Sequence, residues 1–204
     1  MLRKVLDRML EHPVVYNLNR LVAQPTVNRF TTLISEEIPM GAETSVLDLG
    51  CGTGSSRYLV PGRYCGIDIN PAYVAAAKKN HPNDEFVAMD ATRLTFGDAS
   101  FDEVFTVATT HHLDDSQLQA MILEALRVVR RGGAFHIVDG ILPLSPRDRA
   151  KEMFFKMDRG RFARRIEKLV SVASRAAHVE RHRVLTGPLH DVAYLRVVPR
   201  VEAN

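Results

Sequence analysis

Short apolar runs alternate with helical patterns between residues 45 and 139. The apolar runs predict buried strands near residues 45–49, 65–69, 85–89, 101–108 and 134–139. Between them, helices are expected over about 55–60, where Pro61-Gly62 follows, over 71–80, and in a segment that ends at Gly132-Gly133. This alternation predicts a parallel sheet with helices on both faces.

Three of the predicted strands end in an aspartate, at Asp48, Asp68 and Asp90. Because the carboxyl ends of parallel strands meet at one edge of a sheet, we expect the three carboxylates to face one cleft. A strand-ending aspartate also commonly caps the helix that follows, so each residue alone has a structural interpretation. The ordered set of three favours a binding site.

A glycine-rich turn follows the first predicted strand, with Gly50, Gly52 and Gly54 at alternate positions. Glycine adopts positive φ readily and leaves room for a ligand against exposed backbone amides, so the turn predicts a binding loop. Ser55 stands where a dinucleotide fingerprint needs its third glycine, and no Gly-Lys-Ser/Thr ending of a phosphate-binding loop is present. Asp48 would repel a pyrophosphate and attract a cation, so we expect a positively charged cofactor.

The segments on either side of this region differ from it in pattern. Helices are expected over about 2–11, 15–21 and 26–38, and the first carries an apolar face opposite a charged one. That amphipathic helix fits either packing on its own domain or contact with an anionic membrane surface. No apolar stretch approaches the roughly 20 residues of a membrane span.

Towards the other end of the chain, one long or broken helix is expected over about 148–177, with Gly160 as the break. Two strands over 179–185 and 192–198, joined through Thr186-Gly187-Pro188, predict an antiparallel pair at the edge of the sheet.

The segment from Asp48 to Gly54 resembles the first motif of the class I S-adenosylmethionine-dependent methyltransferases, the group that acts on small molecules and lipids. Four further stretches, 65–70, 86–91, 101–113 and 126–139, agree with the family in order and spacing. The resemblance implies an α/β fold: a single Rossmann-like, doubly wound, mostly parallel seven-stranded sheet with an antiparallel C-terminal edge hairpin and helices on both faces. It also implies an N-terminal helical lid over residues 1–40, followed by the methyltransferase domain over 41–204.

The resemblance assigns roles to single residues. Asp68 would accept hydrogen bonds from both ribose hydroxyls of S-adenosyl-L-methionine, Asp90 would face the adenine amino group, and the amide of Ala91 would meet the ring. The cofactor-binding residues that it implies are Asp48, Gly50, Cys51, Gly52, Gly54, Asp68, Ile69, Asp90, Ala91 and Thr109. The product would be S-adenosyl-L-homocysteine.

The candidate catalytic residues are His111 and His112, where the fourth predicted strand opens into a loop. A histidine there could act as the general base for a nucleophile that must lose a proton, although either could be a structural residue of the loop. His136 lies in an apolar strand and fits a hydrogen-bonded core residue. Asp114, Asp115 and Asp139 offer acids but match no metal site well, and we expect no metal.

Composition and charge indicate the number of domains, the cellular setting and the class of partner. The 204 residues suit one domain, and the two cysteines form no metal or disulfide pattern, which predicts a reducing, cytoplasmic setting. From residue 143 onward, the chain has 14 Lys and Arg and 7 Asp and Glu, a net charge of +7. An acidic acceptor or an anionic lipid is therefore conceivable. A solvated face explains the same charge. Nucleic acid is disfavoured because no aromatic platform accompanies the arginines.

These observations predict methyl transfer to a small-molecule acceptor. Two alternatives remain open: methylation of a lipid head group or quinone at a membrane surface, reached through peripheral contact of the N-terminal helix, and a cofactor-binding regulator that transfers no methyl group. The identity of the acceptor and the oligomeric state cannot be read from the sequence.

Overall fold

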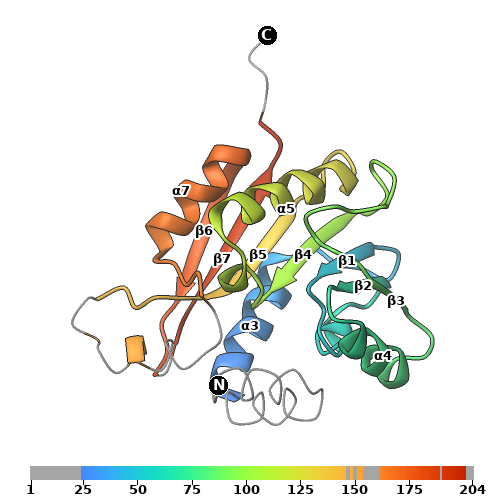
Figure 1. The fold of residues 1–204 in the computed structure, drawn as a ribbon, viewed down its shortest axis with the longest axis horizontal. Helices are drawn as coiled ribbons and strands as arrows, with labels where there is room; N and C mark the ends of the chain where they lie inside the picture. The colour runs from blue at the N-terminus through green and yellow to red at the C-terminus, as the bar shows by residue number, and fades with distance from the viewer. Residues whose placement is uncertain (1–23, 146–147, 149–150, 154–160, 189, 201–204) are drawn as a thin grey trace, which may run out of the picture.

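The computed structural model describes residues 24–145, 148, 151–153, 161–188 and 190–200, which form a seven-stranded sheet in the order β3-β2-β1-β4-β5-β7-β6 (Figure 1). The strands are β1 (Ser45–Leu49), β2 (Arg63–Asp68), β3 (Glu85–Ala88), β4 (Glu103–Val107), β5 (Phe135–Ile141), β6 (His178–Leu185) and β7 (Asp191–Val198). Strands β1 to β5 are parallel to one another, whereas β7 runs antiparallel to both β5 and β6. The predicted parallel sheet with an antiparallel edge pair is confirmed.

Side-chain caps mark the start of two of the described helices, α4 (Pro71–Asn80) and α5 (Asp115–Val128). The other described helices are α3 (Gln24–Glu37), α7 (Ile166–Ala176) and the 3₁₀ turns η1 (Arg57–Leu59) and η2 (Thr110–His112). Asn70 caps α4 through its side chain, with Pro71 in the first helical turn. Asp114 and Gln117 form a reciprocal capping box at the start of α5.

Two apolar layers cover the faces of the sheet. Helices α5 and α7 pack against one face with Leu118, Met121 and Val172, all fully buried. Helices α3 and α4 cover the other face in a second cluster, in which Leu33 and Ile34 of α3 are buried. Helices on both faces were predicted from the alternation of strands and helices.

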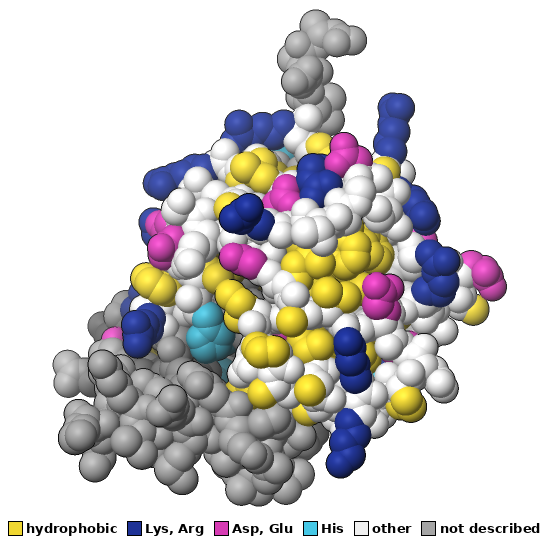
Figure 2. Space-filling view, turned by 45° about the vertical axis from the view of Figure 1, so that its right-hand side comes forward, with side chains coloured by type: hydrophobic (Ala, Val, Ile, Leu, Met, Phe, Trp, Pro, Cys, Tyr) yellow, Lys and Arg dark blue, Asp and Glu magenta, His cyan; other side chains and the backbone are white. Residues whose placement is uncertain are grey.

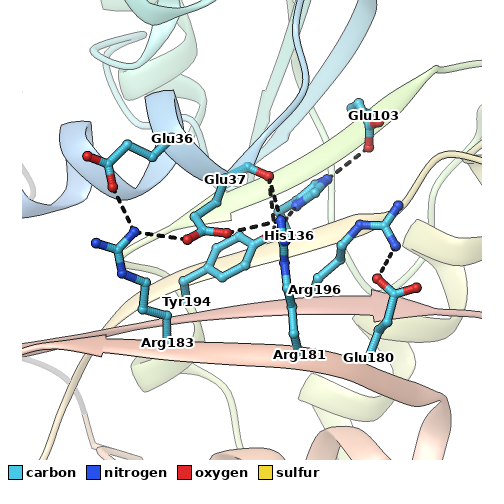
Figure 3. A network of polar contacts seen from close by, with 9 residues as sticks. All are labelled: Glu36, Glu37, Glu103, His136, Glu180, Arg181, Arg183, Tyr194 and Arg196. Carbon is cyan, nitrogen blue, oxygen red and sulfur yellow. Dashed lines mark hydrogen bonds and ion pairs between the residues drawn. The ribbon is translucent and has the colours of Figure 1, made fainter.

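A buried polar network fastens α3 to the strands behind it (Figure 3). His136 of β5 lies 2.8 Å from a carboxylate oxygen of Glu103 and 2.9 Å from the hydroxyl of Tyr194. The Tyr194 hydroxyl also donates to the backbone oxygen of Glu37 at the end of α3, and the Glu37 side chain pairs with Arg183 of β6. Because both ring nitrogens have partners, His136 is the hydrogen-bonded core histidine that its strand position predicted.

Several local expectations need adjustment. The segment after the glycine turn forms turns and the single 3₁₀ turn η1 rather than a helix over 55–60, because Pro61 and Gly62 leave no room for a full helical run. Part of the helix expected over 148–177 is present as α7, but the proposed break at Gly160 lies outside the described residues. The expected lid over 1–40 stays a prediction: residues 1–23 lie outside the description, and α3 is a core helix.

Within the residues that the structure describes, no helix is both long enough and apolar enough to cross a membrane.

Candidate functional site

The carboxyl ends of β1, β2 and β4 meet at one edge of the sheet. The parallel register pairs Leu49 of β1 with Ile67 of β2 on one side and Thr106 of β4 on the other. The turns that follow these strands therefore begin side by side, and Thr109 reaches the first of them through its hydroxyl, 3.5 Å from the backbone oxygen of Leu49. These strand ends lie together at one edge of the sheet, whereas the expectation that Asp48, Asp68 and Asp90 face one cleft stays a prediction.

Backbone amides of the glycine turn after β1 donate hydrogen bonds to the end of β2. Gly50 N and Cys51 N both donate to the backbone oxygen of Ile67 at 2.8 Å. Gly52 N donates to the Asp68 carboxylate at 2.9 Å. These three amides already bond to the end of β2. This arrangement disfavours a phosphate, which needs free N–H groups. The cofactor contact expected of Gly50, Cys51 and Gly52 stays a prediction.

Glycine is required in this turn by protein packing. Gly50 has a φ of +79°, and a Cβ atom there would lie 2.4 Å from the Thr109 hydroxyl oxygen. Gly54 has the same φ, and its Cβ would lie 2.9 Å from the ring of His81 and 3.0 Å from Phe86. A side chain at Gly50 or Gly54 would collide with these groups, so glycine allows the tight turn that brings the ends of β1 and β4 together. The cofactor contact expected of Gly50 and Gly54 stays a prediction.

Asp48 is almost completely buried, with 1% of its surface exposed. Its Oδ2 accepts a hydrogen bond of 2.7 Å from the Tyr64 hydroxyl, whereas Oδ1 is buried without a hydrogen-bond partner. The pKa of Asp48 is raised to about 7. Burial is the main cause and the charge of Asp68 adds to it, whereas the Tyr64 hydrogen bond opposes the rise. An unpartnered buried carboxylate oxygen beside a second carboxylate favours a cation.

Asp68 stands at the tip of β2 with both oxygens in place. Oδ2 accepts the Gly52 amide, and Oδ1 accepts the Asn70 amide at 2.8 Å. Burial raises the pKa of Asp68, and these two backbone hydrogen bonds oppose the rise. Each carboxylate oxygen has two lone pairs, so a carboxylate fixed in this way can still accept two hydroxyl groups.

The residues expected around an adenine ring lie at the ends of β2 and β3. The Ile69 side chain follows Asp68 and is 74% exposed, which is unusual for an isoleucine beside a core. Asp90 is exposed, and its Oδ1 accepts hydrogen bonds from the backbone and hydroxyl of Thr92. Met89 N donates to Asp68 O, which keeps the two strand ends adjacent, and Ala91 follows directly. An apolar side chain and a carboxylate near one another suit a base with an exocyclic amine.

His111 is held in the turn after β4 by the acid that ends β5. Its Nδ1 lies 2.7 Å from Asp139 Oδ1, and only 6% of the residue is exposed. Asp139 Oδ2 accepts the Thr110 hydroxyl at 2.5 Å and the His111 amide at 3.2 Å. Burial raises the pKa of Asp139, but the positive charge and hydrogen bond of His111 and the Thr110 hydroxyl lower it below its ordinary value. Asp139 therefore stays ionised and orients the imidazole.

His112 differs from its neighbour. Its side chain is exposed, and its ring centroid lies 4.2 Å from that of His111. The face drawn in Figure 2 exposes histidine and hydrophobic side chains as well as charged ones. The bond to the buried Asp139 makes His111 the candidate for an oriented base.

Sequence reasoning missed two partners in this site. Asp139 ends the fifth predicted strand as Asp48 ends the first, and this shared position was the available signal. Tyr64 gave no signal, because its contact with Asp48 depends on the register between β1 and β2. Among the residues described, no group of three or more His, Cys, Asp and Glu side chains is arranged to hold a metal ion.

The site fits S-adenosylmethionine on three structural grounds. The glycine turn has its amides occupied, which disfavours a pyrophosphate cofactor. The buried Asp48 oxygen without a partner suits a cationic group, as in the amino and sulfonium groups of this cofactor. Asp68 keeps acceptor capacity for a ribose, beside the exposed Ile69. The residues present therefore match the positive charge and the ribose hydroxyl groups of the cofactor.

Comparison with known proteins agrees with this geometry. A family model described as a methyltransferase domain matches residues 46–133. An uncharacterized methyltransferase of Synechocystis sp. is 35% identical over 135 residues, which are 63% of this chain and 64% of that protein. The 2-methyl-6-phytyl-1,4-hydroquinone methyltransferase of Synechocystis sp. is 38% identical over 111 residues, which are 51% of this chain and 34% of that protein. The chain thus spans less than two thirds of the length of either relative.

The fold is shared with solved methyltransferase structures. Magnesium protoporphyrin IX methyltransferase from Synechocystis, crystallised with bound S-adenosylhomocysteine, superposes with a TM-score of 0.63 and 18% identity. The match covers 89% of this chain and 85% of that protein.

Proposed function

Because the chain belongs to the class I S-adenosylmethionine-dependent methyltransferases, we propose that it transfers a methyl group from this cofactor to a small-molecule acceptor whose nucleophile must first lose a proton. The observation that carries the proposal is the His111–Asp139 pair, held at the same sheet edge as the glycine turn. A phenol or quinol hydroxyl is the type of nucleophile that needs such a base.

The chain's residues divide the work. S-adenosylmethionine, when bound, supplies a methyl group already activated by its sulfonium. Asp68 and Ile69 would hold the nucleoside part of the cofactor, and Asp48 would face the positive charge of its methionine part. With its proton on Nδ1 towards Asp139, His111 keeps its lone pair on Nε2 and takes the proton from the acceptor hydroxyl. The acceptor oxygen forms the new bond to the methyl carbon as the carbon–sulfur bond breaks.

An apolar surface next to His111 favours an acceptor with an apolar part. Phe162 N donates to His111 O at 2.9 Å, and its side chain is 39% exposed. Leu142 N donates to Arg164 O, so residues 142–144 run beside this segment, and Leu144 is 48% exposed. The relative with a phytyl hydroquinone in its name acts on an acceptor of this kind. A quinol or lipid acceptor presented at a membrane surface is therefore the more specific form of the proposal.

The proposal is tested by incubating the protein with methyl-deuterated S-adenosylmethionine and following the label by mass spectrometry. The acceptors are a hydroquinone with an isoprenoid chain, the same ring without the chain, and phospholipid vesicles. We expect label on the tailed hydroquinone before the bare ring. Cofactor binding without label on any acceptor would favour the regulator alternative.

His111→Gln should lower the transfer rate by roughly a hundredfold, because the general base is removed while Asp139 stays in place. His112→Gln is the matched control, since its side chain is exposed, and it should keep most of the rate. The rates are compared at saturating cofactor. Equal losses in the two variants would contradict the assignment of His111 as the base.

A further inference from the structure

Arg164 is a buried arginine outside the groups that carry the proposed chemistry. Only 7% of the residue is exposed, and it lies in the segment just before α7. Its guanidinium donates to the backbone oxygens of Thr110 at 2.9 Å, Phe162 at 3.0 Å and Leu113 at 2.7 Å. Nε and Nη2 also donate to one oxygen of Asp115, at 3.0 and 2.9 Å. These contacts use every N–H group of the fork.

Two of these contacts hold the turn that carries His111. Thr110 is the first residue of η2 and Leu113 is the residue that follows it, so the fork grips both ends of the turn. The adjoining backbone adds a bond to the middle, from Phe162 N to His111 O. Asp115, the first residue of α5, fixes where the turn enters the helix.

The same residue also ties down the segment after Asp139. Leu142, the residue after β5, donates its backbone N–H to Arg164 O at 2.8 Å. The neighbouring Arg165 donates to the backbone oxygen of Pro143. Asp139 lies on β5 and His111 follows β4, so the segment around Arg164 joins the chains that leave the two strands.

We propose that Arg164 is a positioning residue for the His111–Asp139 pair, fixing the distance between a base that follows β4 and its carboxylate partner on β5. This role rests on the proposed function. It requires a guanidinium, because lysine offers a compact charge that cannot grip two backbone carbonyls and a carboxylate in one plane.

A structural role alone would predict a different outcome, and Arg127 supplies the matched control. Its fork bonds to Glu124, Asp98 and the backbone oxygens of Leu94 and Phe96, and none of these belongs to the turn that carries His111. Arg127→Lys and Arg164→Lys therefore each remove a comparable fork while keeping the charge. Only Arg164→Lys should change the position and tautomer of His111.

The primary readout is the state of the histidine rings, measured by long-range proton–nitrogen NMR on the protein labelled at histidine. His111→Gln identifies the His111 signal, and His136, between Glu103 and Tyr194, serves as an internal reference. We expect one fixed tautomer of His111, with its proton on Nδ1, in the wild-type protein and in Arg127→Lys. In Arg164→Lys we expect that tautomer to be lost and the His136 signal to stay.

The second readout is kinetic and also separates this proposal from the proposed function. Arg164→Lys should lower kcat by roughly tenfold to a hundredfold and shift the acid limb of the pH profile of kcat. The affinity for S-adenosylhomocysteine should stay unchanged. If the wild-type protein methylates no acceptor, the proposed function fails while the NMR result still tests Arg164.

An unchanged His111 tautomer in folded Arg164→Lys overturns the proposal. If that variant does not fold, Asp115→Asn takes its place, since it removes the carboxylate partner and leaves the carbonyl bonds. It should move the His111 signal in the same direction by a smaller amount, and no movement overturns the proposal equally.

Discussion

Asp48 shows how far a single residue could be predicted. Its position at the end of an apolar run, before the glycines, indicated a carboxylate at the binding edge. Its bond with Tyr64 and its unpartnered Oδ1 could not be predicted, because both depend on how β1 and β2 align. His111 is similar: the loop position was evident, but its partner Asp139 comes from another strand.

Asp48→Asn should make the protein more stable at pH 8. The folded pKa of about 7 lies above the ordinary 3.8, so the native state holds the proton between these values and stability falls as the pH rises from about 4 to 7. Above pH 7 the full penalty of up to about 4 kcal/mol applies, and the neutral amide avoids it. Urea unfolding at pH 8 and pH 5 measures this, with a smaller gain expected at pH 5.

The same variant should bind S-adenosylmethionine more weakly, because the negative charge that faces the cofactor is gone. For the stability measurement, Asp98→Asn is the control, since that side chain is 79% exposed. It should change the free energy of unfolding by only a few tenths of a kcal/mol. A lower stability of Asp48→Asn at pH 8 would show that the protein favours the charged carboxylate.

At the scale of elements, strands and helices were predicted better than their attachments. Helix α4 begins at Pro71 and ends at Asn80 as expected, because proline and the asparagine cap fix its start. The 3₁₀ turn η1 was expected as a helix over 55–60, because Pro61-Gly62 indicates where that segment ends but not that only a single 3₁₀ turn precedes it. The tie between α3 and β7 through Tyr194 has no sequence signature, because its members lie more than 150 residues apart.

Tyr194→Phe should lower the free energy of unfolding by about 1 to 3 kcal/mol, because it leaves a buried ring nitrogen of His136 without its partner and removes a bond to α3. Tyr58→Phe is the matched control: its side chain is 65% exposed and should change stability by a few tenths at most. Denaturant unfolding compares the two. Equal effects would mean that the network in Figure 3 does not hold α3 in place.

At the scale of the whole molecule, the sheet could be predicted from the sequence. The partners of the basic residues beyond residue 143 could not. The net +7 beyond residue 143 suggested an acidic partner or a solvated face. In the structure, Arg181 and Arg183 pair with glutamates at the end of α3, and Arg164 pairs with Asp115 of α5. These three arginines therefore pair with acids from the rest of the chain, which composition alone cannot show.

The cofactor site is the central claim, and calorimetric titration with S-adenosylmethionine and S-adenosylhomocysteine tests it most directly. The wild-type protein should bind both, and Asp68→Ala should lose about 2 kcal/mol or more, roughly thirtyfold in affinity, because a half-buried acceptor of two hydroxyls is removed. Asp98→Ala should bind like the wild-type protein. Absence of binding by the folded wild-type protein would contradict the account.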